Sequence, residues 1–361
     1  MKIAFVYMQG RLDRLDDVAA GKAPTEFFYG AVELARAGIE VGHFEIDPEK
    51  GRGLLSAGID LVQRLELGPY KTDGRTICQA AALSESLAAY DLVVATASKI
   101  AFAIAFCALA GRPRTPLLAI QCGLLNEEHN PVRRACMRFL MPRMHSMLFG
   151  ESELAPMQKE FDCDAISVNQ FGVDTDFWSP GGREPENLVL SIGNDGRRDF
   201  DTLLAAAPRI AAPIEIVTSR KLPELLPANV TVRRGSWHQR AFTDLELRDL
   251  YRRARCVVVP LIQSLQPSGQ SVALQAMACG VPVILTDTEG LWSREMMVDQ
   301  KNVLLCRAGD PEDLAAKVRR ILEEPATAKR LGQEGRRTVC DAGNIRHFAA
   351  RIEAFCRATK P

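Results

Sequence analysis

The chain has 361 residues, of which 47% are hydrophobic and 25% charged, so it can bury more than one ordinary core and we expect two domains. Its 45 Lys and Arg balance 45 Asp and Glu, which argues against a nucleic-acid-binding protein because such proteins carry excess positive charge. The ten cysteines form no CxxC pair and no Cys/His cluster at zinc spacing. We therefore expect reduced thiols and no structural metal.

The chain begins MKIAFVYM, a single Lys in front of a short apolar run, which predicts a first strand rather than a secretion signal. The most apolar stretch is IAFAIAFCALAG at 100–111, about a dozen residues where a membrane span needs roughly 20. We expect a cytoplasmic protein that is at most peripheral on the inner membrane.

Short runs rich in Val, Ile and Leu alternate with longer helical patterns, as βα units do around a parallel sheet. The first half predicts strands near 2–7, 39–45, 91–95, 116–120, 146–149 and 165–168. The second half predicts strands near 187–192, 213–218, 230–233, 256–259, 282–285 and 303–305. Between the first two strands, PTEFFYGAVELARAG predicts a helix that begins after Pro24 and ends at a Gly.

The segment NPVRRACMRFLMPRMHSML, 130–148, predicts a helix with Asn130 as cap, Pro131 in its first turn and a bend at Pro142. Four arginines and four methionines share it with no acid. This combination suggests an interfacial helix or a contact with a lipid-linked acceptor. The alternative is a helix with Met packed inward and Arg outward.

The best linker is FGVDTDFWSPGGREPEN, 171–187, because it is rich in Gly, Pro and acids. We therefore predict an α/β protein made of two Rossmann-like doubly wound domains that face across a cleft. The expected domains are 1–172 and 173–345, with a C-terminal helix at 346–361 that packs back toward the first. In such sheets ligands lie beyond the carboxyl ends of the strands, so the loops there hold the candidate site.

Strand 187–192 opens into IGNDGRRDFDTLL. Gly193 and Gly196 permit a tight turn, while Arg197 and Arg198 supply positive charge directly before a helix. Backbone N–H groups, a helix N-terminus and a guanidinium all favour phosphate. The alternative is a solvated turn with two surface arginines.

The loop after strand 256–259 carries QPSGQSVALQ, where Gly269 loosens the backbone near the start of a helix with unpaired N–H groups. Ser268, Gln270 and Ser271 can all form hydrogen bonds there. Gln275 follows one turn along, and its amide offers both a donor and an acceptor to sugar hydroxyls. An ordinary serine cap is the alternative.

Other ligands have weaker support. DCD at 162–164 and DTD at 174–176 resemble an Asp-x-Asp metal site, but no supporting His or acid follows either one. His129 and His238 are isolated loop residues. SIGND is not a GxGxxG motif and lacks the acid that holds an adenine ribose, which argues against a dinucleotide oxidoreductase.

Residues 171–335 resemble the C-terminal half of the GT-B glycosyltransferases, closest to family 4, the group 1 enzymes. The segments that carry the resemblance are GVDTDFWSP, GNDGRRDFDTLL, LYRRARCVVVP, QPSGQSVALQAMACGVPVILTDTEG and NVLL…GDPEDLAAKVRRIL. The first half matches loosely, through PTEFFYGAVELARAGIEVGHFEID and the position of QCG. The resemblance implies a UDP-sugar or GDP-sugar donor in the C-terminal domain, a hydroxyl acceptor in the N-terminal domain, retention of anomeric configuration and no metal.

On this resemblance, Arg198 stands where the family has a diphosphate-binding Lys, and Arg197 covers for the Arg that Asn194 replaces. Gln275 stands at the glutamate that holds the ribose hydroxyls. Gln266 matches the first acid of the family's acid pair, although one residue more than in the family separates it from Gln275. The catalytic residues expected from this are Arg198, Arg197 and Gln266.

The predicted donor-binding residues also include Glu289 and Gly290, which fall where a Gly-Gly loop of the family faces the transferred sugar. The full donor set is Gly193, Asn194, Arg197, Arg198, Ser268, Gly269, Gln270, Ser271, Gln275, Glu289 and Gly290. The predicted acceptor set is Gln9, Gly10, Glu26, Cys122 and Gly123, in which Cys122 of QCG falls where the family often has a His.

The sequence thus predicts a retaining, metal-independent glycosyltransferase of hexosyl type that builds a cell-envelope polysaccharide or glycolipid. Two alternatives remain open. One is a non-catalytic nucleotide-sugar-binding protein that kept the fold after losing its acids. The other is a sugar-nucleotide epimerase of the same fold. Both alternatives bind a nucleotide sugar but do not transfer its sugar to an acceptor.

Overall fold

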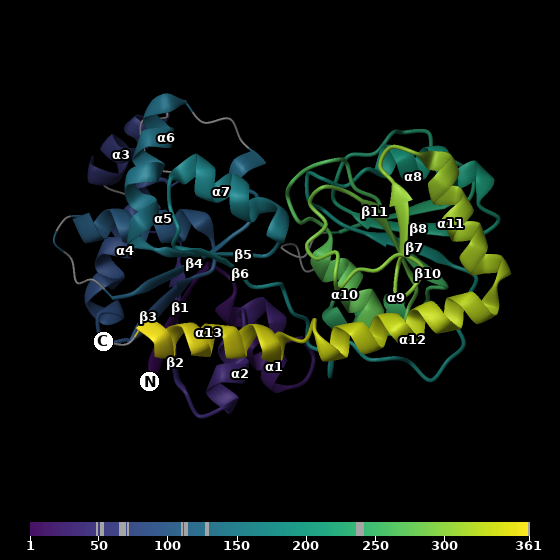
Figure 1. Ribbon diagram of the computed structural model, residues 1–361, viewed down its shortest axis with the longest axis horizontal. Helices are drawn as coiled ribbons and strands as arrows, with labels where there is room; N and C mark the ends of the chain where they lie inside the picture. The colour runs from purple at the N-terminus through teal and green to yellow at the C-terminus, as the bar shows by residue number, and fades with distance from the viewer. Residues whose placement is uncertain are drawn as a thin grey trace. The chain divides into compact units, whose positions relative to one another are not determined.

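The computed structural model describes residues 1–47, 50, 54–64, 70, 72–109, 111, 115–126, 130–235 and 242–359. The chain forms two compact units, shown in Figure 1. Unit 1 comprises residues 1–16, 27–170 and 348–361, and unit 2 comprises residues 17–26 and 171–347. The sequence placed these boundaries at 172/173 and 345/346, and it did not foresee that 17–26 would cluster with unit 2. His129 and His238 lie outside the described residues.

Unit 1 is built on a parallel sheet in the order β2-β1-β3-β4-β5-β6. Its strands are β1 (Lys2–Met8), β2 (Glu40–Ile46), β3 (Leu92–Ala95), β4 (Leu117–Gln121), β5 (His145–Leu148) and β6 (Ile166–Val168). Its helices include α2 (Ala31–Arg36), α3 (Leu54–Arg64), α4 (Gly74–Leu87), α5 (Ser98–Leu109), α6 (Pro131–Leu140), α7 (Leu154–Phe161) and most of α13 (Ile345–Thr359), while α1 (Leu15–Ala19) leads into 17–26. Among the described residues, no helix is both long and apolar enough to cross a bilayer.

Alternate residues of a strand point to opposite sides of the sheet. Because these strands are apolar at successive positions, both faces of the sheet are apolar. Val93 and Ala95 of β3 belong to a core shared with α4, α5, α6 and α7. On the other face α13 closes the unit, where the rings of His145 and Phe355 lie 4.5 Å apart between centroids.

Two predicted helices of unit 1 are shorter than expected. The helix after Pro24 is interrupted, because Gly30 has a φ of +83° and a Cβ there would lie 2.9 Å from Ala349 Cα. A 3-10 turn (Glu26–Phe28) and α2 take its place. The helix predicted over 130–148 keeps its Asn130 cap but ends at Leu140, since Pro142 lies in a separate 3-10 turn that leads into β5.

Unit 2 has a second parallel sheet in the order β12-β11-β10-β7-β8-β9. Its strands are β7 (Val189–Ile192), β8 (Ile214–Thr218), β9 (Val230–Arg234), β10 (Cys256–Val259), β11 (Val283–Asp287) and β12 (Leu304–Arg307). Its helices include α8 (Phe200–Ala206), α9 (Asp244–Arg253), α10 (Gln270–Ala278), α11 (Pro311–Glu323) and α12 (Pro325–Asp341). The twelve predicted strands are all present within two residues of their expected ends, which confirms the predicted fold class.

The strand order of unit 2 reverses between β7 and β10, which are neighbours in the sheet although β8 and β9 separate them in the chain. Val257 and Val259 of β10 face a core shared with α9 and α10, while Cys256 and Val258 face a core shared with α8 and α11. The sheet is thus buried on both sides. Its carboxyl edge at the β7/β10 switch point is the place where such sheets bind ligands.

Candidate functional site

The loops after β7 and β10 are joined to each other by backbone hydrogen bonds. Asp199 N–H donates to Pro260 O at 3.0 Å, and Ile262 N–H donates to Arg197 O at 3.0 Å. Arg198 and Leu261 form an isolated antiparallel bridge between them. The two segments that the sequence selected as donor-binding loops therefore meet at the switch point.

Arg198 lies at the centre of this junction, with its side chain only 3% exposed. Its Nε forms an ion pair with Asp195 Oδ2 at 2.8 Å, but neither Nε nor Nη1 has a hydrogen-bond partner in the described structure. Burying a cation is costly unless its donors are satisfied. A buried guanidinium with spare donors is suited to an anion that arrives from outside.

Two glycines make room for Arg198. A Cβ on Gly193 would lie 2.0 Å from Arg198 Nε. A Cβ on Gly269, whose φ is +79°, would lie 2.6 Å from Val259 Cγ1 and 3.3 Å from Arg198 Nη1. The sequence suggested a tight turn as the reason for Gly193, whereas the structure gives space for the guanidinium as the reason.

The open helix N-terminus belongs to α10 and not to α8. The sequence expected phosphate at the start of α8, where the Asp199 carboxylate accepts from Thr202 N–H at 3.0 Å and so caps one of the helix N–H groups. α10 begins after Gly269 with no side-chain cap. The buried Ser268 Oγ beside it makes no hydrogen bond in the described structure, so an ordinary serine cap is not formed there.

Gln275 is buried in a polar cluster. Its Oε1 accepts from the Tyr251 hydroxyl at 3.1 Å, and its Nε2 donates to Glu26 Oε1 at 3.0 Å. The Trp178 indole N–H donates to the same Glu26 oxygen at 2.7 Å. The sequence did not predict this cluster. Its one signal was Trp178 within the linker motif.

The sequence predicted that Glu26 binds the acceptor, but its side chain points into the protein interior. It belongs to unit 2, its side chain is fully buried, and its Oε2 accepts from Asp174 N–H at 3.0 Å. Burial raises its pKa to about 7, although the hydrogen bonds from Gln275 and Trp178 oppose that shift. In this structure Glu26 orients Gln275 and presents no surface to an acceptor.

Gln266 is held close to the arginine pair. Its Oε1 accepts from Arg197 Nε at 3.4 Å. Its backbone carbonyl explains Gly290, because a Cβ on that glycine would lie 2.4 Å from Gln266 O. Glu289 N–H donates to Gln263 Oε1 at 2.8 Å. The structure thus brings the predicted loop 289–290 against the predicted loop 266–271.

Asn194 is directed away from Arg198. Its Oδ1 accepts from the Ser219 hydroxyl at 3.0 Å and from Thr218 Oγ1 at 3.2 Å. Arg220 was missed by the sequence, although it follows β8, the neighbour of β7. Its Nη1 donates to Asp195 O and Arg198 O, each at 2.9 Å, and so fixes the loop that carries the buried cation.

In unit 1 a cavity of about 290 Å³ lies beyond the carboxyl ends of β3 and β4. Cys122, a predicted acceptor residue, lines it together with Tyr29 and Phe149. Gly123 N–H donates to Glu153 Oε1 at 2.8 Å. The predicted residues Gln9 and Gly10 do not line this cavity.

Glu153, which accepts the hydrogen bond from Gly123 in the loop after β4, is a buried acid. It is 1% exposed, and its Oε2 has no hydrogen-bond partner in the described structure. Burial raises its pKa to about 7, opposed by the hydrogen bond from Gly123.

Metal ligands are not gathered anywhere in the described ranges: no three His, Cys, Asp or Glu side chains lie together as a metal would require. In the DTD segment, Asp174 Oδ1 instead accepts from the N–H groups of Asp176 and Phe177 at 3.1 and 3.0 Å. The Asp174 carboxylate therefore stabilises a turn.

The sequence of unit 2 matches a known family. Residues 186–324 match the family model described as Glycosyl transferases group 1. A D-inositol 3-phosphate glycosyltransferase of Nocardiopsis dassonvillei is 25% identical over 228 residues, which cover 54% of this chain and 51% of that protein. The chain thus spans about half the length of the curated relatives it matches.

Solved structures match the whole fold. Sucrose-phosphate synthase from Thermosynechococcus elongatus superposes with a TM-score of 0.71 at 20% identity and covers 98% of both chains. Anabaena HepE, solved in complex with UDP and glucose, superposes with a TM-score of 0.67 at 16% identity and covers 99% of this chain and 100% of that one. The predicted fold and family resemblance are confirmed at this level: the chain has the GT-B fold, and its residues 186–324 match the family model of the group 1 glycosyl transferases.

Proposed function

We propose that the chain is a retaining, metal-independent glycosyltransferase that moves a hexosyl group from a nucleoside diphosphate sugar to a hydroxyl acceptor. The observation that carries the proposal is Arg198, a buried guanidinium with two donors unused at the switch point of unit 2. The uncapped N-terminus of α10 lies in the adjoining loop. Together they offer two independent attractions to a diphosphate.

In this proposal the protein positions the reactants and stabilises charge. The bond between the anomeric carbon and the phosphate oxygen breaks, and the acceptor oxygen bonds to that carbon on the same face. The acceptor proton passes to the departing phosphate oxygen. Arg198 and the α10 amides stabilise the negative charge that grows on the diphosphate, and they act strongly because the guanidinium is buried. Arg197 holds Gln266 next to the transferred sugar.

Gln275 binds the ribose hydroxyls. Its amide carries two N–H donors and two acceptor lone pairs, of which Glu26 uses one donor and Tyr251 uses one acceptor. One of each remains for a pair of hydroxyls. We propose UDP as the nucleotide, and the structural neighbour Anabaena HepE, which was solved with UDP bound, supports this choice.

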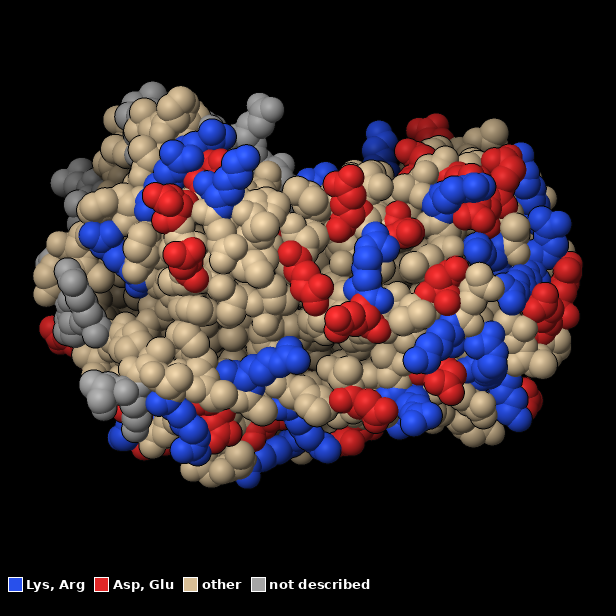
Figure 2. All heavy atoms as spheres, in the orientation of Figure 1, with Lys and Arg blue, Asp and Glu red and all other residues tan. Residues whose placement is uncertain are grey.

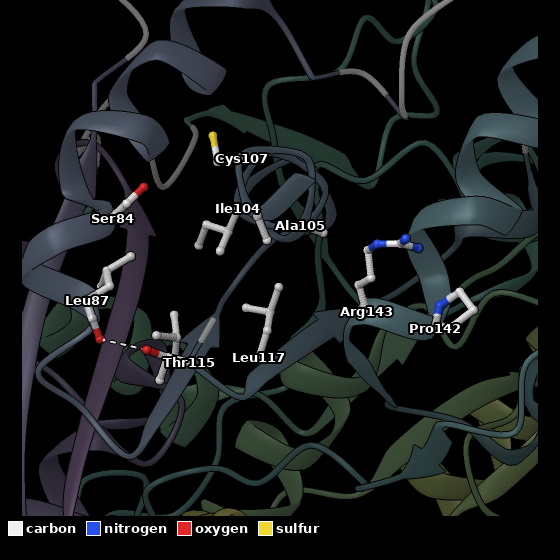
Figure 3. A pocket seen from close by; sticks show the side chains of 11 residues that line it. Ser84, Leu87, Ile104, Ala105, Cys107, Thr115, Leu117, Pro142 and Arg143 are labelled. Carbon is white, nitrogen blue, oxygen red and sulfur yellow. Dashed lines mark hydrogen bonds between the residues drawn. The ribbon is translucent and has the colours of Figure 1, made fainter. Parts of the chain in front are cut away.

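We further propose that the acceptor is a lipid-linked or cell-envelope glycan and that unit 1 touches the membrane surface. Val132 and Phe139 of α6 are 51% and 55% exposed. Figure 3 shows an apolar cavity of about 220 Å³ between α5 and the turn after α6, with the Arg143 side chain at its wall. Exposed apolar side chains beside basic ones favour an interfacial surface.

The basic residues of α6 are partly occupied, which limits this surface. Arg134 pairs with Glu160 at 2.8 Å and Arg138 Nε donates to Glu160 O. In Figure 2 the blue side chains around α6 accordingly lie next to red ones. The apolar residues therefore carry more of the proposed membrane contact than the charges do.

The test of the proposed function is an assay of the purified full chain against a panel of UDP-sugars and GDP-sugars. We expect slow release of nucleoside diphosphate for one donor, faster release with the correct acceptor, and an α-linked product from an α-linked donor. Tight donor binding without turnover would favour the non-catalytic binder, which the amides at Gln266 and Gln275 make the main rival. Conversion of the donor sugar without release of nucleotide would favour the epimerase.

A further inference from the structure

A second large cavity, of about 460 Å³, lies at the opposite edge of the unit 2 sheet. Its walls include Arg255, which directly precedes β10, and Pro282, which directly precedes β11. The linker segment 180–185 and the first half of α12 complete it. It is therefore at the amino ends of strands whose carboxyl ends form the candidate donor site, and it shares no residue with that site.

The lining of this cavity is strongly cationic. Five of its side chains are basic and only one, Glu184, is acidic; the five are Arg183, Arg252, Arg255, Lys329 and Arg336. Figure 2 shows Lys and Arg side chains over the region of α12 on the visible face of unit 2, with Asp and Glu side chains between them. The chain as a whole is neutral, so the excess positive charge is local to the cavity.

Two of the five cations have structural partners. Arg252 Nε donates to Ser179 O at 2.7 Å, and an Arg336 Nη1 donates to the carbonyls of Trp178 and Ala278. These bonds fix both guanidinium groups in the wall, where they satisfy the last carbonyl of α10 and two carbonyls within the linker. Of the two, only Arg252 approaches a carboxylate in the described structure, that of Asp249 at 3.6 Å, which is itself 68% exposed.

The other three cations are not held by an ion pair among the described residues. The side chains of Arg183, Arg255 and Lys329 make no ion pair in the part of the chain that the structure describes. They come from three separate segments: the linker, the start of β10, and α12. Arg183 and Lys329 are exposed and Arg255 is half-buried, so water solvates them in part. Their convergence on one cavity nevertheless gives it a positive potential that attracts an anion.

We propose that this cavity binds a small phosphate-bearing molecule at a site separate from the donor site. A cavity of this size accommodates a hexose phosphate or a pyrophosphate together with its bound water. The ligand would join the linker, β10 and α12 by charge-assisted hydrogen bonds. Its binding therefore stabilises unit 2 without entering the switch point.

The test is a calorimetric titration of the full chain with inorganic phosphate, pyrophosphate and a hexose phosphate, which separates the possible sources of the phosphate. We expect one of the three to bind, with affinity that weakens as NaCl increases because the cations are partly exposed. A triple variant, Arg183→Ala with Arg255→Ala and Lys329→Ala, should bind that probe at least about tenfold more weakly. Glu184→Gln should bind it more tightly than the parent, since the only carboxylate of the lining is removed.

Two controls make the result decisive. Arg319→Ala removes an exposed cation of α11 outside the cavity and should leave binding unchanged. Arg198→Ala should retain the cavity's binding while losing affinity for nucleoside diphosphate. The proposal is overturned if no probe binds up to about 10 mM, if the folded triple variant binds like the parent, or if Arg198→Ala alone abolishes all binding.

Discussion

Each unit buries a charged side chain beyond the carboxyl ends of its strands, and the two charges have opposite signs: Glu153 in unit 1 and Arg198 in unit 2. In unit 1, Glu153 contacts the loop after β4 with one carboxylate oxygen unpaired in the described structure. In unit 2, Arg198 lies in the loop after β7 with two guanidinium nitrogens lacking hydrogen-bond partners among the described residues. Desolvation disfavours both charges, and for Glu153 it raises the pKa to about 7. Because both lie beyond the carboxyl ends of their strands, where such sheets bind ligands, the difference concerns what each unit can receive.

A phosphate is attracted by Arg198 and repelled by an ionised Glu153. A neutral hydroxyl, by contrast, can donate a hydrogen bond to a carboxylate. On this contrast we propose that the anionic donor binds to unit 2 and the uncharged hydroxyl to unit 1, with Lys99 also lining the unit 1 cavity and Glu26 also buried in unit 2. Substitutions at these residues and their neighbours test the assignment.

The strongest predicted effect is on the pH dependence of stability through Glu153. Its pKa is raised to about 7 from an ordinary value near 4.5, so the folded state binds the extra proton between these values. Stability from this group is fully present below about pH 4.5 and is lost as the pH rises through 7, by about 3 kcal/mol in total. Glu153→Gln keeps the acceptor for Gly123 N–H and should lack this loss. Denaturant unfolding at pH 5 and pH 8 measures it, and equal pH slopes in parent and variant would contradict it.

The next effect concerns Arg198. Arg198→Ala should weaken nucleoside diphosphate binding by about 2–3 kcal/mol, roughly 30- to 150-fold, because a charge-assisted contact is lost. Arg198→Lys should recover part of the loss, since the family that this chain resembles has a Lys there. Calorimetry with UDP measures both. If Arg198→Ala bound UDP as tightly as the parent, Arg198 would not be the diphosphate contact, and the comparison of the two buried charges would be wrong.

A smaller effect is expected at Gln275, where truncation removes neutral hydrogen bonds. Gln275→Ala should weaken nucleotide binding by about 1–2 kcal/mol. Gln275→Glu, which restores the acid typical of the family, should bind nucleotide worse than the parent at pH 8, because it would place two buried carboxyl groups side by side at Glu26. The deficit should shrink at pH 6. A Gln275→Glu variant that equals the parent at both pH values would show that Glu26 does not govern this side chain.

The weakest effect is expected at the surface of α6. Val132→Ser with Phe139→Ser should reduce sedimentation with anionic vesicles more than Arg134→Gln with Arg138→Gln does, since those arginines are already paired with Glu160. Each free basic residue near such a surface contributes about 1 kcal/mol. If the parent does not sediment with vesicles, α6 is an ordinary surface helix.

The sequence predicted the strands, which the structure confirms, and it selected the two loops that the structure brings together. Both predictions depend on local signals: apolar runs of strand length, and Gly-rich segments that follow them. It could not anticipate the partners of those loops. Glu26 and Gln275 are 249 residues apart in the chain, and no local pattern relates them. Likewise the sequence analysis selected Arg197 and Arg198 before α8 but did not foresee that the Asp199 carboxylate caps that helix.

The proposed function requires that the diphosphate of a nucleotide donor binds to Arg198 and the N-terminus of α10, and a crystal structure of the full chain with UDP tests this requirement. We predict a β-phosphate oxygen within hydrogen-bonding distance of Arg198 Nη1 and of a backbone N–H in the first turn of α10, with the ribose near Gln275. A diphosphate found instead among Arg183, Arg255 and Lys329, with the Arg198 donors still unpaired, would contradict it.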